Sequence, residues 1–474
     1  MGRSAAVNRE ILRLALPSIL ANMTVPLVGM VDLGVAGHLD LSSQGAGTAA
    51  LIGGIAIGTM LFDLLYWNFG FLRISTGGLT AQAWGAGDRK ECAGILARSL
   101  SLALAAALFL ILIQWFFVQL AFLVVRCTPE VEALARSYFR IRIWAAPATL
   151  SLMAFKGWFI GMQDGVSAMT TDLVVNGVNI VASVVLSLGI PPVGTAAPLW
   201  KGLGFEGVAW GTLAAQYAGL LCAVSLVLFK YRRIFTECFR DTSLAKVLRS
   251  GNNAKLFSMN ADIFVRSLCF IAVYVGFTMI SARLGDVLLA VTTIMMKLLM
   301  IFSYFSDGFA YAGEAMTGRY IGAGDGEGLR LSVRWNFVWC AGLSAVFMLA
   351  YGLGGVPMLR MMTSDPVVVD ASRAYLPWLL LMPLAGVGAF AWDGIYVGAT
   401  CTKYIRQCMV WAVAAFFAVW FSGAFFFYPD MPGSLPGATY EKAAHLLMAA
   451  YFAHLLARTA VLSAAARKAI FSRF

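Results

Sequence analysis

GAGD stands at residues 85–88, and the same four letters return at residues 322–325. The offset is 322 − 85 = 237, half of the 474 residues in the chain. A second pair keeps this offset, with GWFIG at 157–161 and GIYVG at 394–398. The sequence therefore indicates two similar halves. Membrane proteins built from repeats commonly hold a ligand near the repeat interface, which points to a transporter.

The composition is that of a membrane protein. Hydrophobic residues make up 60% and charged residues 12% of the chain, and the mean hydropathy is +0.79. Soluble domains carry about 25% charged residues. The net charge of +11 comes from Lys and Arg in short loops, which favours lipid headgroups over nucleic acid as their partner.

Twelve apolar segments reach the length of about 20 residues that a bilayer requires, and all must be helical because lipid cannot satisfy an open backbone. Their predicted ranges are 11–36, 48–73, 94–124, 133–160, 168–190, 206–229, 257–282, 288–315, 332–354, 370–397, 405–427 and 443–465.

Six of these segments precede the longest polar stretch, residues 230–255, and six follow it. We predict an all-α polytopic membrane protein with twelve transmembrane helices in two pseudo-symmetric six-helix bundles. Its parts are an N-terminal lobe at 1–229, a cytoplasmic linker at 230–255 with a short amphipathic helix, and a C-terminal lobe at 256–474. An even helix number per half makes the repeats parallel.

Loop charges predict the orientation. With the N-terminus inside, most loop Lys and Arg lie on the cytoplasmic side, as the positive-inside rule requires. The outer loops hold fewer, namely Arg126, Lys201, Arg283, Arg360 and Lys442. Both termini and both GAGD elements are therefore expected on the cytoplasmic face.

Asp32 is the first candidate for the mechanism, because charged groups within the membrane are costly and mark functional sites. It follows Pro26 by six residues, and a proline inside a helix removes a hydrogen bond and kinks the helix. We predict Asp32 as the ion-coupling residue and Pro26 as a structural hinge. The alternative is a structural Asp that caps a distorted turn.

Polar residues in the fifth and sixth segments could complete a pocket around Asp32. Asn176 and Asn179 are three apart and share a helix face, and Thr212 lies mid-membrane in the next segment. Together they could hold a proton network or a small cation through oxygen atoms. Hydrogen bonding between helices is the simpler alternative.

The second half carries further candidates in its membrane segments: Asp262, Lys297, Asp307, Glu314 and Asp393. Asp262 and Arg266 are spaced i, i+4 and are expected to neutralise each other. Asp307 and Glu314, seven apart, share a face near which Lys297 also falls. That set is either a proton path or a structural group of ion pairs.

Other chemistries find no support in the sequence. The Cys and His residues show no metal-ligand spacing, and no Asp-rich cluster suggests a membrane enzyme such as a prenyl-phosphate transferase. We expect no enzyme activity, no metal and no cofactor, with transport driven by a proton or sodium gradient. The expected partners are a small-molecule substrate and membrane lipid, and the protein is expected to work as a monomer.

Several stretches resemble the DinF branch of the MATE family, the multidrug and toxic compound extrusion transporters. They are LALPSILANMTVPLVGMVDLGVAGHLD (14–40), FLRISTGGLTAQAWGAGD (71–88), ARLGD (282–286), SDGFAYAGEAMTGRYIGAGD (306–325) and WDGIYVGAT (392–400). The resemblance implies a twelve-helix, two-lobe antiporter in the bacterial inner membrane. Such proteins expel cationic amphipathic compounds in exchange for protons or sodium.

The resemblance also places individual residues. Asp32 falls on the acid of an ion-coupling site, and Asn179 and Thr212 fall on its polar partners. Many members carry a second acid four residues after the Asn179 position, where this chain has Ser183. One carboxylate in place of two favours proton coupling over sodium coupling.

The cargo has an alternative on the same fold, a lipid-linked or anionic metabolite. Such a cargo would need a basic groove, for which Lys156 and Lys297 are the candidate cations.

Overall fold

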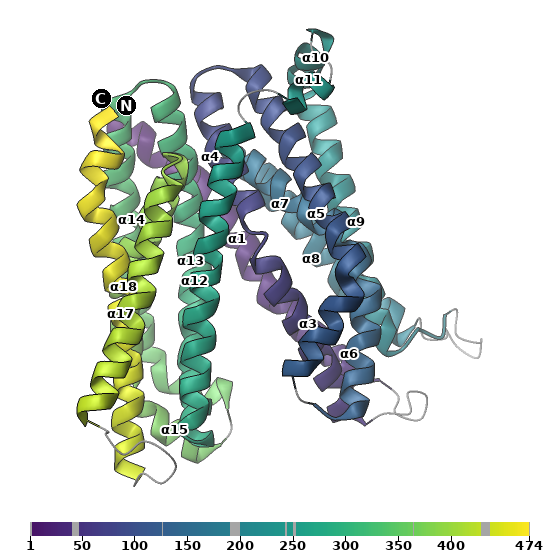
Figure 1. The fold of residues 1–474 in the computed structure, drawn as a ribbon, viewed down its shortest axis with the longest axis vertical. Helices are drawn as coiled ribbons and strands as arrows, with labels where there is room; N and C mark the ends of the chain where they lie inside the picture. The colour runs from purple at the N-terminus through teal and green to yellow at the C-terminus, as the bar shows by residue number, and fades with distance from the viewer. Residues whose placement is uncertain are drawn as a thin grey trace. The chain divides into compact units, whose positions relative to one another are not determined.

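The computed structural model describes residues 2–39, 47–125, 127–189, 200–241, 244–249, 253–363, 365–427 and 437–473, and these are almost entirely helical. The helices, labelled as in Figure 1, are α1 Arg3–Gly37, α3 Thr48–Trp67, α4 Phe71–Gly85, α5 Arg89–Val124, α6 Pro129–Arg142, η1 Ile143–Ala145, α7 Ala146–Gly161, α8 Gly165–Leu188, α9 Phe205–Lys230, α10 Arg232–Asp241, α11 Leu244–Arg249, α12 Asn253–Arg283, α13 Asp286–Gly322, α14 Gly326–Met362, α15 Pro366–Arg373, α16 Leu376–Gly398, α17 Thr402–Phe427, α18 Gly437–Ala469 and η2 Phe471–Arg473.

Twelve helical stretches in the described residues are long and apolar enough to span a membrane, which confirms the predicted number. Two of them are interrupted where a single helix was predicted. The second span breaks at residues 68–70 between α3 and α4, where the Asn68 side chain donates to Leu64 O at 2.7 Å. The fourth breaks at η1, which ends two residues before Pro147 in the first turn of α7, because proline donates no backbone hydrogen bond.

Helix contacts divide the chain into two compact units. The N-terminal unit is Leu20–Leu256, and the C-terminal unit is Met1–Ile19 with Phe257–Phe474. The later boundary falls where the sequence predicts the end of the linker. The earlier one differs from the prediction, because the first half of α1 belongs with the C-terminal helices.

Polar side chains hold residues 3–19 within the C-terminal unit. Arg3 forms an ion pair with Asp325 at the start of α14, and Glu10 pairs with Arg319 near the end of α13 at 3.0 Å. Two tryptophan indoles of α14 also donate hydrogen bonds to side chains of this segment. Such long-range contacts between helices are not visible in the apolar pattern that defined the predicted lobes.

The two GAGD elements form the same structure in each unit. Gly87 and Gly324 adopt positive φ of 74° and 70°, which glycine reaches without strain. Asp88 then caps α5 by accepting from Glu91 N, and Asp325 caps α14 by accepting from Gly328 N, both at 2.9 Å. Each element ends one helix and begins the next.

The second repeat places two helix crossings at the same offset. A Cβ on Gly157 of α7 would lie 2.1 Å from the carbonyl oxygen of Arg73 in α4. A Cβ on Gly394 of α16 would lie 2.0 Å from the carbonyl oxygen of Ala310 in α13. Arg73 and Ala310 are themselves 237 residues apart. Only glycine allows backbones to approach this closely, as in other membrane helix pairs.

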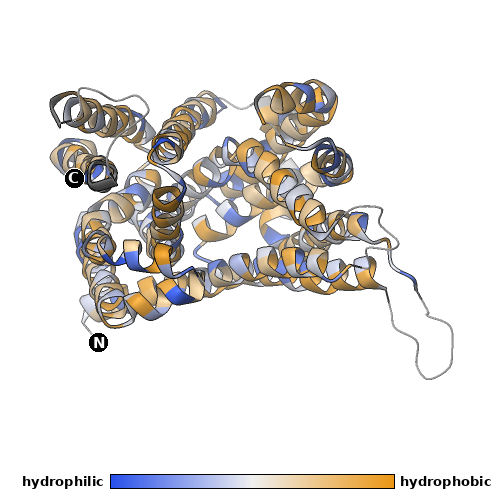
Figure 2. Cartoon of the chain, turned by 90° about the horizontal axis from the view of Figure 1, so that it is seen from below, coloured by the Kyte–Doolittle hydropathy of each residue, from blue (hydrophilic) through white to orange (hydrophobic). Residues whose placement is uncertain are grey.

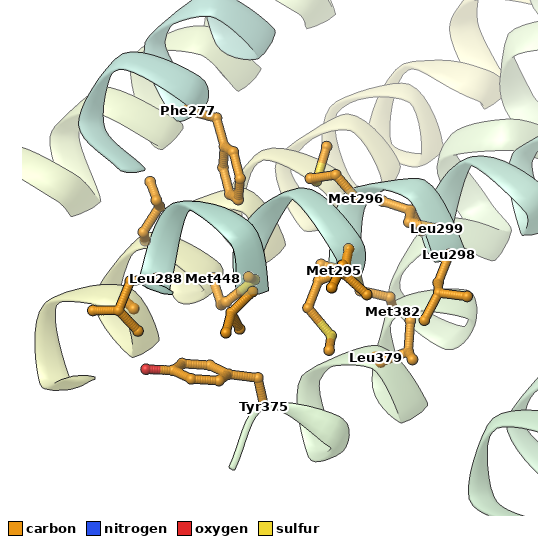
Figure 3. Packing of buried hydrophobic residues seen from close by; sticks show 14 of the residues in the cluster. Phe277, Leu288, Met295, Met296, Leu298, Leu299, Tyr375, Leu379, Met382 and Met448 are labelled. Atoms are coloured by element: carbon orange, nitrogen blue, oxygen red, sulfur yellow. The ribbon is translucent and has the colours of Figure 1, made fainter. Parts of the chain in front are cut away.

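Hydrophobic residues, coloured orange in Figure 2, predominate along the helices of both units. In the C-terminal unit, Met295, Leu298 and Leu299 of α13 pack in one buried cluster with Leu379 and Met382 of α16 (Figure 3). At the end of the chain, α17 and α18 run side by side (Figure 1).

The linker helix α10 is amphipathic, as the sequence predicts, but its apolar face packs on the protein. Ile234 and Cys238 are buried, and Cys238 Sγ lies 3.6 Å from Lys90 O at the start of α5.

Asp164, between α7 and α8, fastens the start of this linker. It accepts hydrogen bonds from Lys230 Nζ and Tyr231 Oη, each at 2.6 Å. Burial alone raises the pKa of the Asp164 carboxyl, but hydrogen bonds from Lys230, Ser167 and Tyr231 outweigh it and hold the pKa below its usual range.

Candidate ion-coupling and charged sites

Asp32 is buried in the N-terminal unit with 8% of its surface exposed. Its carboxylate faces the hydroxyl of Ser183 on α8, yet Asp32 Oδ1 and Ser183 Oγ lack a partner at regular hydrogen-bond geometry. No described Lys or Arg forms a salt bridge with Asp32. Because an unbalanced carboxylate is costly in this environment, one proton is the simplest group that can neutralise it.

The polar residues of α8 lie along the side that meets α1 and α9. Asn179, 3% exposed, donates from Nδ2 to Thr212 Oγ1 on α9 at 3.0 Å. Asn176 Nδ2 donates to Thr24 Oγ1 on α1 at 2.5 Å. Ser183 lies one turn beyond Asn179, so the four predicted residues fall along one strip of contacts between α1, α8 and α9. Within this strip, no hydrogen bond joins Asp32 directly to Asn179 or Thr212.

Glycines bring α9 against this strip. A Cβ on Gly211 would lie 2.6 Å from Ser183 N, and a Cβ on Gly207 would lie 2.5 Å from Leu186 O. Larger residues at these positions would move α9 away. The close approach lets the short side chains of Asn179 and Thr212 reach each other.

Arg142, at the end of α6, is the cation whose charge acts on Asp32. Its Nη1 lies 3.2 Å from Tyr138 Oη and 3.5 Å from Thr59 Oγ1. Its guanidinium lies 4.8 Å from the centre of the Phe62 ring, and its charge acts on Asp32 without an ion pair. A cation that forms no ion pair with Asp32 stabilises negative charge on it only partly.

In the C-terminal unit the predicted pair of Asp262 and Arg266 is wrong. Asp262 Oδ1 pairs instead with Arg406 Nη1 at 2.7 Å, and Thr402 Oγ1 donates to Asp262 Oδ2 at 2.8 Å. Both partners come from α17. The i, i+4 spacing fails here because contacts between helices supply better partners than the neighbouring turn of α12.

Arg266 pairs with Asp393 of α16, its Nη2 lying 2.5 Å from Asp393 Oδ2. Arg458 of α18 reaches the same oxygen with Nη2 at 3.0 Å. Three helices therefore meet at Asp393. The Arg458 side chain is 2% exposed and that of Asp393 13%.

The predicted acid–base set on α13 does not form one line. Lys297 is exposed, Asp307 is half-buried and Glu314 is fully buried. Ten residues at about 100° each leave Lys297 about 80° around the helix from Asp307. Within the part of the chain that the structure describes, Lys297 forms no ion pair with Asp307 or Glu314.

Arg142 and Arg458 are membrane cations that were not among the predicted site residues. Both fall inside predicted segments, 133–160 and 443–465, so the rule that selected the buried acids would have found them. Among the described residues, no group of three His, Cys, Asp or Glu side chains is placed to hold a metal ion.

The family model described as MatE matches residues 17–185 and 263–422, more than half of the chain. The chain belongs to the MatE family. This MatE chain is 34% identical over 415 residues to DNA damage-inducible protein F of Escherichia coli, covering 86% of the chain and 84% of that relative. It is thus a multi-pass membrane transporter of the DinF branch and not an enzyme.

More distant relatives also match most of the chain. The probable multidrug resistance protein NorM of Thermotoga maritima is 22% identical over 382 residues, which covers 77% of the MatE chain and 75% of that protein. A Vibrio cholerae MATE transporter, VcmN in a mutant form, superposes with a TM-score of 0.81 at 15% identity over 100% of this chain and 99% of its own. A Pyrococcus furiosus transporter of the MOP superfamily gives a TM-score of 0.76 at 18% identity over 98% and 97%. These structures share the fold.

Proposed function

We propose that this MatE transporter is a secondary antiporter, acting as a monomer, that exports small cationic or amphipathic compounds in exchange for protons by alternating access of its two lobes. The supporting observation is Asp32, a buried carboxylate beside a hydroxyl, with no salt bridge among the described residues. A proton changes its charge next to a segment where Pro26 removes a helix hydrogen bond. The two protonation states then favour different conformations of α1, which is the requirement for coupling.

A sodium gradient without a pH gradient should drive little export in proteoliposomes. Sodium is a hard cation that needs several oxygen ligands, preferably charged ones, and the predicted site offers one carboxylate, Asp32, beside the uncharged Ser183. Ser183→Asp places a second carboxylate beside Asp32 and should add sodium-driven export. Fluorescent-substrate efflux under sodium or proton gradients of equal size measures both.

Ser183→Asn, of similar size but uncharged, is the matched control and should stay insensitive to sodium. Strong sodium-driven export by the unmodified protein would overturn the proton assignment.

We also propose that the protein lies in the bacterial cytoplasmic membrane with both termini in the cytoplasm. Cysteines at two exposed positions after the GAGD elements, Lys90→Cys and Glu327→Cys, should then react with an impermeant maleimide only in inside-out vesicles. Lys201→Cys, in a predicted outer loop, should react only in right-side-out vesicles. Each variant is compared with the unsubstituted protein, because the chain has eight native cysteines. Labelling of positions 90 and 327 from opposite sides would contradict the parallel repeat.

The two cations considered for binding the alternative cargo, a lipid-linked or anionic metabolite, do not form a basic groove for it. Lys156 Nζ lies 2.7 Å from Asp172 Oδ2, which balances its charge, and Lys297 is exposed on α13. A site for an acidic group would have to use other cations of the chain.

A further inference from the structure

The cluster of Asp393, Arg266, Arg458 and His454 in the C-terminal unit carries more positive than negative charge. Asp393 Oδ2 is the shared acceptor of both guanidinium groups. Asp262, which lies one turn before Arg266 on α12, is already paired with Arg406. Two arginines therefore share one carboxylate, and burial makes such an excess of charge expensive unless another anion joins it.

Aromatic rings surround the two guanidinium groups without cancelling their charge. Arg266 and Arg458 lie 4.8 Å and 4.9 Å from the centre of the Phe270 ring, and Arg458 lies 5.8 Å from that of Phe390. Cation–π contacts stabilise a buried arginine, but its hydrogen-bond donors still need acceptors. The rings also provide apolar surface next to the charged groups.

Several polar atoms in the cluster remain available to bind a ligand. Within the described residues, Arg458 Nε, His454 Nδ1 and Asp393 Oδ1 have no hydrogen-bond partner. Arg458 is 2% and His454 1% exposed, so these atoms are held in the interior of the unit. The Arg266 side chain, 18% exposed, is the more accessible arginine of the cluster. A planar acid group is the acceptor that guanidinium donors match best.

The corresponding place in the N-terminal unit shows that the fold does not require this charge. Lys156 precedes Asp393 by 237 residues, and it forms an ion pair with Asp172. That pair is electrically balanced. Of these two equivalent places, the one in the C-terminal unit therefore has two arginines on a single carboxylate.

We propose that the Arg266–Arg458–Asp393 cluster binds an acidic group of an amphipathic aromatic cargo, a carboxylate in the simplest case. Arg266 and Arg458 hold the anion, Asp393 keeps both guanidinium groups in place, and Phe270 and Phe390 contact the apolar part. The assignment rests on the proposed export of amphipathic compounds and specifies the chemistry of one end of the cargo.

The test uses the full chain in phosphatidylcholine nanodiscs without any gradient, with three fluorescent probes that differ in one group: pyrenebutyrate, pyrenebutanol and pyrenebutylamine. The unmodified protein should bind the carboxylate about tenfold more tightly than the alcohol, as one charge-assisted contact provides. Arg266→Gln should remove this preference. Asp393→Asn keeps a side-chain oxygen that accepts from both guanidinium groups but removes the competing negative charge, so it should strengthen the preference. Arg406→Gln, which changes an arginine outside the cluster, should leave it unchanged.

Alcohol binding, measured against empty nanodiscs, confirms that each variant is folded. Equal binding of carboxylate and alcohol by the unmodified protein would overturn the site, as would equal effects of Arg266→Gln and Arg406→Gln or weaker carboxylate binding by Asp393→Asn. The test distinguishes failure of this binding site from failure of the proposed proton coupling. A lost carboxylate preference with intact pH-driven export removes only this site, whereas sodium-driven export with the preference retained removes only the proton assignment.

Discussion

Asp32→Asn is expected to abolish pH-driven export while leaving membrane insertion and folding intact. The amide has nearly the shape of the protonated acid and can keep contact with Ser183, but it cannot release a proton. The α1 segment around Pro26 would then remain in the conformation favoured by the neutral side chain, and the cycle would stop. Export from everted vesicles under an imposed pH gradient, with substrate fluorescence as readout, should fall to the level of vesicles without the protein.

Asp370→Asn is the matched control for this substitution. The Asp370 side chain is 73% exposed on α15, and its only ion pair within the described residues is a loose i, i+3 pair with Arg373 at 3.4 Å, so its loss should change little. Retention of normal pH-driven export by Asp32→Asn, with Asp370→Asn also active, would remove Asp32 from the coupling role.

The fold was largely predictable because lipid permits few solutions. Apolar length fixed twelve spans, and the repeated GAGD and Gly-x-x-x-Gly elements indicated two like halves before any helix was placed. The repeated letters indicated equivalent positions in the two halves, and Gly87 and Gly324 indeed adopt the same positive φ there. The interruption at η1 was not predictable from hydropathy, since Ile143, Trp144 and Ala145 are as apolar as the helices around them.

Partners of charged side chains were much harder to predict. Sequence spacing suggests Arg266 for Asp262, yet the side chains from α16 and α17 decide the pairing. Which helices meet at a given depth depends on helix rotation, and rotation is set by close contacts such as that of Gly394 with Ala310. In the N-terminal unit the same limit applies. Asp32 was found from its chemistry, whereas its approach to Ser183 required the structure.

Gly157→Ala and Gly394→Ala are expected to prevent correct folding, although each adds a single methyl group. The new Cβ would lie 2.1 Å from Arg73 O or 2.0 Å from Ala310 O, far inside contact distance, and a backbone carbonyl cannot rotate away as a side chain can. The helices must separate along the whole crossing. Overpacking typically costs about 1–3 kcal/mol, and we expect the upper end or more. Yield of monodisperse protein and the temperature of half-loss on size-exclusion chromatography measure the effect.

Gly177→Ala and Gly342→Ala provide the matched controls in the same two units. Both glycines lie within helices, α8 and α14, and an added Cβ would meet nothing within 4 Å. Alanine favours helix over glycine by about 1 kcal/mol, so these variants should be as stable as the original protein or slightly more so. Normal stability of Gly394→Ala would mean that α13 and α16 can separate freely, and the repeated glycines would then have a role other than close packing. Equal loss of stability in all four variants would instead show that the chain generally does not tolerate alanine in place of glycine.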